Sequence, residues 1–272
     1  MADQGNILVL VEMDQDRVSD LSLEMLGCAL QLAGKNHKRD VIAVVFGHGF
    51  GTLGEDLISF GANKVILFEG KLCLPYQADA WLPDMAAIAK ETKASLILMG
   101  HNSTGGDLAP RLAFQLKCGI ATSCEKIVIK GTKTFLTRTC YGGKAREVLS
   151  FDNEVAIATI RPKSQTPITR DIERRGGIET KPLSIEENDV RVNVVERKHV
   201  ESDGPKLENA SIIVAGGGGL GGPKGFEIAA DLAGVLGGAV GASRVACDQG
   251  WCPPGYQIGL SGKTVAPELY IA

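Results

Sequence analysis

The stretch from Ser211 to Arg244, SIIVAGGGGLGGPKGFEIAADLAGVLGGAVGASR, contains the residues best suited to hold a ligand. Glycine has no Cβ, so the backbone between Gly216 and Gly222 can approach a ligand closely. A helix that begins directly afterwards, at Pro223, presents free N–H groups that favour phosphate. The stretch therefore predicts a cradle for the pyrophosphate of a nucleotide, with a plain tight turn as the alternative.

A strand and a helix must flank this turn to position it. The run from Ser211 to Ala215 is apolar and β-branched, as expected for a strand buried in a parallel sheet. Small and apolar residues then recur at helical spacing, at Phe226, Ala229, Ala230, Ala233 and Leu236. The order is strand, glycine turn and helix.

Gly216, Gly218 and Gly221 satisfy the dinucleotide-binding glycine pattern. The match is not specific, because a tract with this many glycines satisfies several registers. The acidic residue that holds a ribose, expected about 20 positions further on, is poorly placed, since Asp231 comes too soon and Asp248 too late.

The composition is that of an ordinary globular protein. With 272 residues, the chain is long enough for about two domains, and it is 44% hydrophobic and 22% charged. A net charge of −3 gives no electrostatic reason to expect nucleic acid or an anionic membrane as partner. We expect no membrane insertion, because no apolar run approaches the length of a span. The N-terminus has neither a signal nor a transit pattern and predicts a first strand in a cytoplasmic protein.

The cysteines also indicate a cytoplasmic protein. They are seven in number, scattered, and without a C-x-x-C pair. Reduced thiols are the favoured interpretation. Cys247 and Cys252 lie near each other in the sequence, and a metal or redox pair there is the less favoured alternative.

The first hundred residues alternate strands and helices. Strands are predicted over 7–11, 41–46, 64–68 and 96–99, and helices over 21–33, 53–60 and 78–92. This alternation is typical of a parallel sheet covered by helices on both faces.

Two histidines follow strands of this sheet, His48 after the second and His101 after the fourth. The loop from His101 to Asp107 could bind an anion. The simpler interpretation is a polar connection in which Asp107 caps a helix over 108–116. No partner that would make either histidine a general base is visible in the sequence.

From residue 120 the pattern changes. Strands are predicted over 125–130, 134–141, 146–150 and 155–160, with turns at glycines. The polar, proline-marked segment from Arg161 to Pro182 is interpreted as an arm or linker, whose Arg170, Arg174 and Arg175 are solvated or face a partner. A half-exposed strand is predicted over 189–198.

We therefore predict an α/β protein of two domains, each with a mostly parallel sheet flanked by helices. The first domain spans 1–180, a linker and lead-in strand span 181–210, and the second domain spans 211–272. Residues 269–271 predict the start of another buried strand with which the sequence stops, so we expect the chain to be a fragment of a longer protein.

Specific stretches resemble the alpha subunit of electron transfer flavoproteins. In the second domain they are 216–220, 240–244, 257–263 and 265–272, and in the first domain 106–113 and 141–145. The resemblance covers nearly the whole chain. It implies a Rossmann-like first domain similar to adenine nucleotide alpha hydrolases, and a second domain that binds FAD.

What the family resemblance implies for the site can be stated residue by residue. The cofactor-binding residues would be Gly218, Ser243, Arg244, Ile258, Gly259, Leu260 and Ser261. Ser243 would contact the diphosphate, Arg244 would lie by the isoalloxazine ring, and the stretch from Ile258 to Ser261 would pass beside the flavin with a hydroxyl near N5. A fixed guanidinium favours anionic reduced forms of the ring, so these residues would tune redox chemistry.

The sequence departs from the family at three places. Gly218 stands where many members have an arginine, and Leu260 and Ser261 stand where many have glutamine and threonine, a variant that resembles anaerobic and some electron-bifurcating members. The family's segment after Ala272, with a histidine near the flavin, is not part of this sequence.

The favoured hypothesis is an electron carrier without enzymatic activity of its own. The resemblance implies a heterodimer with an electron transfer flavoprotein beta subunit, with acyl-CoA or other dehydrogenases as donors and a quinone-linked oxidoreductase as acceptor, as in fatty acid β-oxidation. The alternatives are an NAD-dependent dehydrogenase that uses the turn from Gly216 to Gly221, and a nucleotide-binding scaffold without redox activity.

Overall fold

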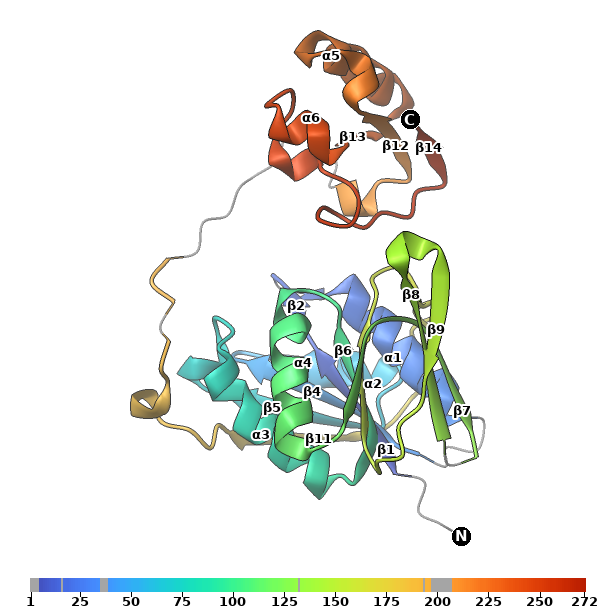
Figure 1. Ribbon diagram of the computed structural model, residues 1–272. Coiled ribbons are helices and arrows are strands. Elements are labelled where there is room, and N and C mark those ends of the chain that lie inside the picture. The colour runs from blue at the N-terminus through green and yellow to red at the C-terminus, as the bar shows by residue number, and fades with distance from the viewer. Residues whose placement is uncertain (1–4, 16, 35–38, 132, 193, 197–206) are drawn as a thin grey trace. The chain divides into compact units, whose positions relative to one another are not determined.

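The computed structural model describes residues 5–15, 17–34, 39–131, 133–192, 194–196 and 207–272. The chain divides into two compact units, residues 1–195 and 196–272. Each unit has its own sheet and core, and they are described separately (Figure 1).

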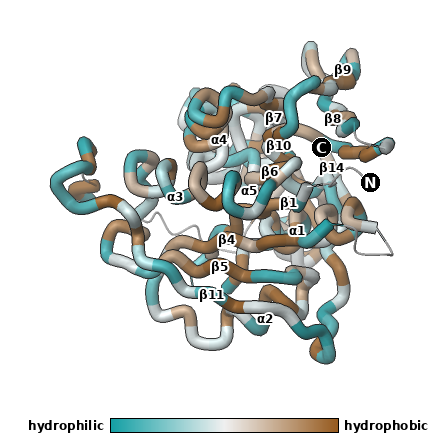
Figure 2. Tube along the Cα trace, turned by 90° about the horizontal axis from the view of Figure 1, so that it is seen from below, coloured by the Kyte–Doolittle hydropathy of each residue, from teal (hydrophilic) through white to brown (hydrophobic). Residues whose placement is uncertain are grey.

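A nine-stranded sheet forms the centre of the first unit, in the order β11-β5-β4-β1-β6-β10-β7-β8-β9. Its parallel core consists of β1 Asn6–Val11, β4 Val41–Gly47, β5 Lys64–Glu69, β6 Ala94–Gly100 and β10 Ala156–Ile160. These strands are apolar on both faces because helices cover both. Figure 2 shows the hydrophobic colour along β1, β4 and β5, whereas β9 combines charged and apolar residues. The four strands predicted before residue 100 are confirmed.

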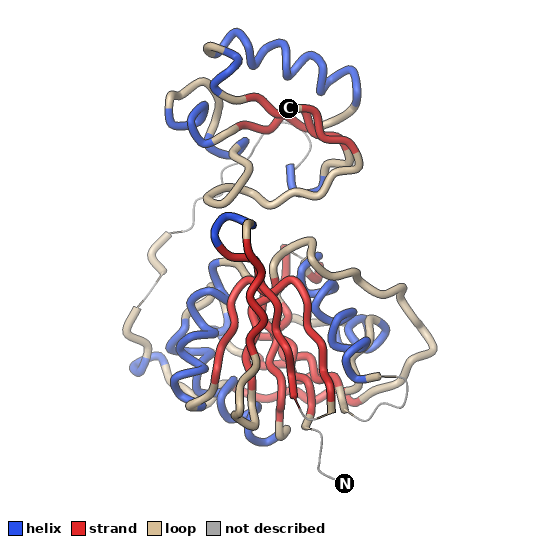
Figure 3. The backbone as a smooth tube through the Cα atoms, turned by 45° about the vertical axis from the view of Figure 1, so that its right-hand side comes forward, coloured by secondary structure: helices blue, strands red, loops and turns tan. Residues whose placement is uncertain are grey.

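The helices lie on both faces of this sheet (Figure 3). One face is covered by α1 Asp20–Ala33 and α2 Leu53–Ser59, and the other by α3 Ala78–Glu91 and α4 Ser103–Leu116. Leu26 and Leu57 pack with the first face, and Met85 and Leu112 with the second. The predicted parallel sheet between two helical layers is confirmed.

Three strands extend the sheet of the first unit at one edge, and they are joined to each other in antiparallel pairs. They are β7 Gly119–Lys130, β8 Lys133–Cys140 and β9 Ala145–Leu149. Gly131 lies in the connection between β7 and β8 with a positive φ of 62°, a conformation that suits glycine. A short hairpin of β2 Met13–Asp14 and β3 Arg17–Val18 follows β1.

The loop predicted over 101–107 is wrong, because α4 begins one turn earlier. Asn102 is the N-cap, and its side-chain oxygen accepts a hydrogen bond from the amide of Gly105 at 3.0 Å. Asp107 therefore lies inside the helix, where its carboxylate accepts from the Tyr76 hydroxyl at 2.9 Å and from Arg111 Nε at 2.8 Å. No open anion loop remains at this place.

The segment from Arg161 to Pro182 is not an arm or linker, because it packs on the first unit. A Cβ at Gly27 of α1 would lie 2.5 Å from the carbonyl oxygen of Thr166, so the two backbones are in close contact. The segment ends as β11 Gly177–Pro182, an edge strand parallel to β5. A strand was predicted over 189–198. The structure describes residues 189–192 and 194–196 of this range, and none of them is in a strand.

Arg170 and Arg174 contact earlier parts of the first unit, whereas Arg175 bonds to carbonyl oxygens of its own segment. Arg170 pairs with Asp56, and its Nε donates to the Ser59 hydroxyl at 3.1 Å. Arg174 Nε donates to the carbonyl oxygen of Ala62 at 3.4 Å, and Arg175 Nη1 donates to the carbonyl oxygen of Ile172 at 3.1 Å.

The second unit is built on a parallel three-stranded sheet in the order β13-β12-β14. Its strands and helices are β12 Ile212–Gly216, α5 Pro223–Leu236, β13 Ala239–Ala242, α6 Arg244–Asp248 and β14 Leu269–Ile271. The predicted order of strand, glycine turn and helix is confirmed. The strand over 269–271 is present, but the prediction that it is buried is wrong, because Leu269 and Tyr270 are exposed. No helix in the described ranges is long and apolar enough to cross a membrane.

Candidate functional site

The glycine turn follows the central strand of the second unit. The chain leaves β12 at Gly217, passes through a 3-10 turn at Gly218–Leu220, and enters α5 at Pro223. β13 pairs with one side of β12 and β14 with the other, so the strand order reverses at β12. Open parallel sheets bind ligands at the carboxyl ends of strands where this reversal occurs.

The two sides of the turn differ. On the inner side, a Cβ at Gly216 would lie 2.2 Å from Leu220 Cδ1, and one at Gly225 would lie 2.6 Å from the Leu220 carbonyl oxygen, so these glycines let the turn pack tightly. On the outer side, a Cβ at Gly218 would meet nothing within 4 Å, and the same holds at Gly219, Gly221 and Gly222. The outer side is therefore an open backbone surface.

The start of α5 is suited to an anion. Its N-cap is Gly222, no side chain caps its amides, and its first turn contains no acidic residue. Free amides at the N-terminus of a 14-residue helix attract negative charge. The turn and the helix thus have the chemistry of a phosphate cradle.

Ser243 follows β13 directly and lies beside the turn. Its amide donates to the carbonyl oxygen of Gly216 at 2.9 Å, which joins the carboxyl ends of β12 and β13. A Cβ at Gly217 would lie 3.2 Å from the Ser243 hydroxyl oxygen, so the absence of a side chain there makes room for the hydroxyl.

The hydroxyl of Ser243 is buried and has no hydrogen-bond partner among the described residues. Ser243 is the N-cap of α6, a position where serine usually bonds an amide of the first turn, yet its side chain makes no such bond. An unsatisfied buried hydroxyl costs about 1–3 kcal/mol. A phosphate oxygen would satisfy this hydroxyl, so the residues present fit a nucleotide diphosphate.

Arg244 opens α6 and is exposed. Its Nε lies 3.2 Å from Asp248 Oδ2, in an ion pair whose side chains are 69% and 63% exposed. Such an exposed pair is weak, so the guanidinium is held loosely and can turn to another anion.

The segment from Gln257 to Lys263 is bound to the end of β13. The amide of Ile258 donates to the carbonyl oxygen of Ala242 at 2.9 Å. The Ile258 side chain packs over Gly241, where a Cβ would lie only 2.3 Å from Ile258 Cδ1. Its side chain therefore belongs to the core of the second unit, and only its backbone is available to a ligand.

The rest of this segment forms a tight turn. The amide of Lys263 donates to the carbonyl oxygen of Gln257 at 2.8 Å, and Gly259 has a φ of 121°. Leu260 is fully exposed at its tip, and the hydroxyl of Ser261 accepts from Gln257 Nε2 at 2.8 Å. The tip offers an apolar side chain and a hydroxyl next to each other.

The structure thus brings several of the predicted site residues together. Ser243 contacts the glycine turn, and Ile258 anchors the tight turn to β13. Sequence reasoning named Gly218 and missed Gly217 and Gly241. The predicted strand ended at Ala215, whereas β12 continues to Gly216, so the first residue after the strand is Gly217, which lies beside Ser243.

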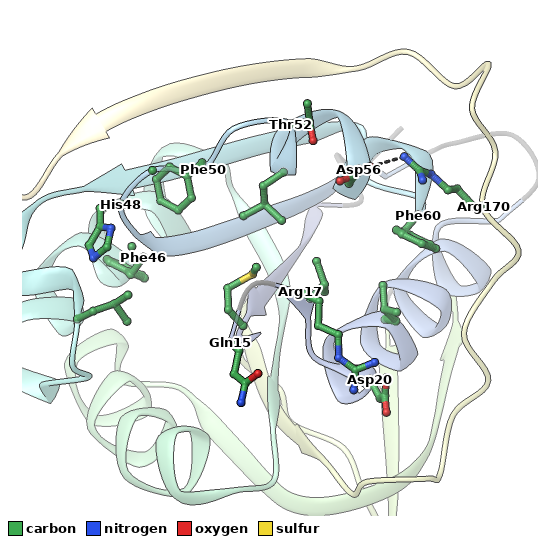
Figure 4. Close-up of a pocket in the computed structure, with 17 residues that line it drawn as sticks. Gln15, Arg17, Asp20, Phe46, His48, Phe50, Thr52, Asp56, Phe60 and Arg170 are labelled. Carbon is green, nitrogen blue, oxygen red and sulfur yellow. Dashed lines mark hydrogen bonds and ion pairs between the residues drawn. The ribbon is translucent and has the colours of Figure 1, made fainter. Parts of the chain in front are cut away.

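A cleft of about 530 Å³ lies at the carboxyl ends of β1 and β4 in the first unit (Figure 4). His48 lines it, as predicted for a loop after a strand. Its charges are mixed, because Arg17 and Arg170 line it together with Asp20 and Asp56, and Arg170 pairs with Asp56. The cleft therefore has no surplus of positive charge that would mark an anion site.

His101 lies outside this cleft and has a structural contact. Its Nδ1 is 2.9 Å from the Thr159 hydroxyl. Burial and, to a lesser extent, the charge of Arg161 lower the pKa of His101. Within the part of the chain that is described, no group of three or more potential ligand side chains is arranged for a metal ion.

Each of the two units matches a family model. Residues 7–186 match the family model described as the electron transfer flavoprotein domain, and residues 206–272 match the electron transfer flavoprotein FAD-binding domain.

Curated relatives match over almost the whole chain. The electron transfer flavoprotein subunit alpha of Thermoanaerobacterium thermosaccharolyticum is 37% identical over 100% of this chain and 83% of its own length. That of Bacillus subtilis is 34% identical over 98% of this chain and 80% of its own. Protein FixB of Clostridium saccharobutylicum is 31% identical over 100% of this chain and 81% of its own.

Proposed function

The chain belongs to the electron transfer flavoprotein alpha subunit family, and from this premise we propose that its second unit holds the diphosphate of FAD at the glycine turn between β12 and α5. The observation that carries this proposal is the buried, unpartnered hydroxyl of Ser243 beside Gly217. Because the turn is open on its outer side and α5 begins with uncapped amides, a diphosphate is the ligand group that these residues fit.

The role of the protein is electron transfer and not the conversion of a substrate. Bound FAD supplies the chemistry, since its ring accepts electrons and gives them up. The family assignment sets aside the alternatives of an NAD-dependent dehydrogenase and of a scaffold without redox activity.

Each candidate residue has a proposed task. The backbone at Gly218 and the hydroxyl of Ser243 hold the diphosphate, and the guanidinium of Arg244 lies by the ring and favours its anionic reduced form. Backbone groups of Ile258 and Gly259 line the ring, because the Ile258 side chain is committed to the core over Gly241.

Leu260 and Ser261 complete the proposed ring site. Leu260 excludes water from one side of the ring. Ser261 donates a hydrogen bond to ring nitrogen N5, for which its hydroxyl hydrogen is free because its oxygen is the acceptor from Gln257.

Alpha subunits of this family pair with a beta subunit and exchange electrons with dehydrogenases. Acyl-CoA dehydrogenases as donors, a quinone-linked oxidoreductase as acceptor and a cytoplasmic location are the finer parts of the proposal. They follow from the family resemblance alone.

The test is the visible absorption spectrum of the chain co-expressed with the beta subunit, followed by acid extraction of the cofactor. We expect a yellow heterodimer that releases FAD in a ratio near one per alpha chain. A Ser243→Ala variant prepared in parallel should retain less FAD. A folded heterodimer without flavin, or one in which the variant retains as much FAD as the parent, would overturn the proposed site.

A further inference from the structure

Two free cysteines lie next to each other in the second unit. The sulfur atoms of Cys247 and Cys252 are 3.6 Å apart. Cys247 is half-buried at the end of α6, whereas Cys252 is buried with Phe226, Ala242 and Ala246. One thiol is therefore accessible to a small molecule, and the other lies directly behind it.

Backbone hydrogen bonds fix this arrangement, in addition to the contact between the two thiols and the hydrogen bond from Cys247 Sγ to the Pro253 carbonyl oxygen at 3.7 Å. The amide of Gly250 donates to the carbonyl oxygen of Cys247 at 2.9 Å, and the amide of Trp251 donates to that of Ala246 at 3.0 Å. Gly250 has a φ of 70°, so α6 ends in a Schellman motif. This motif reverses the chain and returns Cys252 to the side of Cys247.

The chemistry of the two thiols is unequal. Burial, the hydrogen bond to Cys247 and the charge of Cys247 raise the pKa of Cys252 to about 12, so Cys252 stays protonated at neutral pH. The more accessible Cys247 is then the thiol that attacks, because exchange requires an accessible thiolate.

We propose that Cys247 and Cys252 form a reversible intramolecular disulfide by exchange with a low-molecular-weight disulfide. The Cys247 thiolate attacks one sulfur of the small disulfide, which forms a mixed disulfide and releases one small thiolate. The Cys252 sulfur then attacks Cys247 as its proton leaves to solvent, and the second small thiolate departs. The protein is oxidised by two electrons, and the small disulfide is reduced to two thiols.

The bond would link the two ends of the segment 247–252, which is part of a longer loop next to the candidate FAD site. This loop begins at Ala242 and returns to the same residue, since the amide of Ile258 donates to the Ala242 carbonyl oxygen. Ser243, Arg244 and Cys247 lie in its first half, and Cys252 lies in its second half. The oxidised pair would restrain the loop that carries both site residues, independently of whether FAD is bound.

The other buried cysteines are suited to packing. Burial raises the pKa of Cys28 and of Cys73 to about 11 and that of Cys124 to about 12. All three side chains lie in the cores of the first unit. They serve as internal standards that should stay reduced.

The test is a redox titration of the full chain in buffers of reduced and oxidised glutathione, with acid quenching, alkylation of remaining thiols, trypsin digestion and mass spectrometry. Trypsin cleaves after Arg244 and Lys263, so one peptide, 245–263, contains both cysteines and no other. We expect this peptide to change from doubly alkylated to a form lighter than the reduced peptide by two hydrogen atoms. Peptides with Cys28 and Cys73 should remain alkylated.

Variants identify the order of events. Cys252→Ser should accumulate glutathione on Cys247, Cys247→Ser should leave Cys252 as a thiol, and the control Cys140→Ser should titrate like the parent. The inference is overturned if peptide 245–263 stays doubly alkylated throughout the titration. It is equally overturned if the parent stops at the mixed disulfide or crosslinks between chains.

Discussion

The hydroxyl of Ser243 lies against Gly217, at a distance of 3.2 Å from the position that a Cβ there would occupy. The contact exists because the Ser243 amide binds the Gly216 carbonyl oxygen and so fixes the end of β13 beside the end of β12. Gly217 and Ser243, which are 26 positions apart in the sequence, therefore lie side by side at the carboxyl ends of β12 and β13. Glycine directly after β12 leaves room for the hydroxyl of the serine directly after β13.

Replacing Ser243 with alanine should weaken FAD binding without weakening the fold. A hydrogen bond to a charged phosphate is worth about 1.5–3 kcal/mol, so we expect the dissociation constant to rise about tenfold to a hundredfold. Among the residues that the structure describes, the hydroxyl has no partner, so its removal leaves no group unpaired there and the cofactor-free protein should melt at the same or a higher temperature. Fluorescence titration with FAD and calorimetry measure the two effects.

Ser211→Ala is the matched control for this variant. It removes the same group from the opposite, amino-terminal end of β12, where the Ser211 carbonyl oxygen accepts from Leu269 at 3.1 Å. Its FAD affinity should equal that of the parent. Wild-type affinity in Ser243→Ala, or equal losses in the two variants, would contradict the assigned role of Ser243.

Gly217→Ala should weaken FAD binding through Ser243. The backbone at Gly217 has a φ of −139°, which alanine adopts without strain, so the expected change comes from the Cβ against the hydroxyl. The double variant Gly217→Ala/Ser243→Ala should bind FAD no more weakly than Ser243→Ala alone, because neighbours that act through one contact are not additive. Additive losses in a titration of the four proteins would show that Gly217 acts separately.

The elements of the fold that were predicted correctly are those whose pattern lies within one short stretch of the sequence. Apolar runs such as that of β1 and the helical spacing after Pro223 are contained in single stretches of sequence, and both elements formed as expected. The start of α4 was missed because Asn102 and Asp107 both suit an N-cap, and the choice depends on Gly105. A Cβ at Gly105 would lie 1.9 Å from the Gly100 carbonyl oxygen, a contact between helix and strand that is not visible in the sequence.

Other features depended on contacts between distant segments. The segment before β11 is polar and resembles a linker, and it is ordered by contacts with Asp56, Ser59 and Gly27, more than a hundred residues earlier. The glycine tract allowed several registers, so the sequence alone did not show which glycine lies beside Ser243. The sequence separation of Cys247 and Cys252 does not determine the distance between their sulfur atoms. That distance depends on the turn at Gly250, which the sequence did not predict.

Gly241→Ala should displace the segment that carries the proposed ring contacts. Its Cβ would lie 2.3 Å from Ile258 Cδ1, and overpacking of this kind costs about 1–3 kcal/mol. We expect faster hydrogen exchange of the Ile258 amide, which donates to Ala242, and a lower melting temperature of the cofactor-free protein. Ile258→Ala in the same chain should restore part of the loss, and a double variant no better than Gly241→Ala would contradict this packing.

The stability of the protein should depend on pH through Glu24. This residue is buried, and its carboxylate oxygens accept from the amides of Lys163 and Gln165 at 3.2 and 3.4 Å. Burial raises its pKa above the ordinary value of 4.5, against the opposing effect of these amides. The folded state therefore keeps the proton to a higher pH than the unfolded state. The contribution of Glu24 is fully present below about pH 4.5 and is lost as the pH rises through the folded pKa.

Urea unfolding at a series of pH values, followed by circular dichroism, measures this effect. The difference in unfolding free energy between the parent and Glu24→Gln should shift against the parent as the pH rises above 4.5. The exposed Glu154→Gln is the control and should show no such trend. A difference that grows in favour of the parent would mean that the carboxylate, and not the acid, is stabilised in the fold.

Changes at Arg244 and at its partner Asp248 should move the reduction potential of bound FAD in opposite directions. Arg244→Ala removes a cation proposed to lie by the ring, so the anionic reduced form loses stabilisation and the potential should fall by tens of millivolts, where ~59 mV corresponds to a tenfold change for one electron. Asp248→Asn removes the carboxylate 3.2 Å from Arg244 Nε, which frees the guanidinium and should raise the potential.

Spectroelectrochemistry of both variants, with the exposed Lys90→Ala of α3 as control, measures the shifts. Potentials that stay unchanged in both variants while FAD remains bound would exclude Arg244 from the surroundings of the ring.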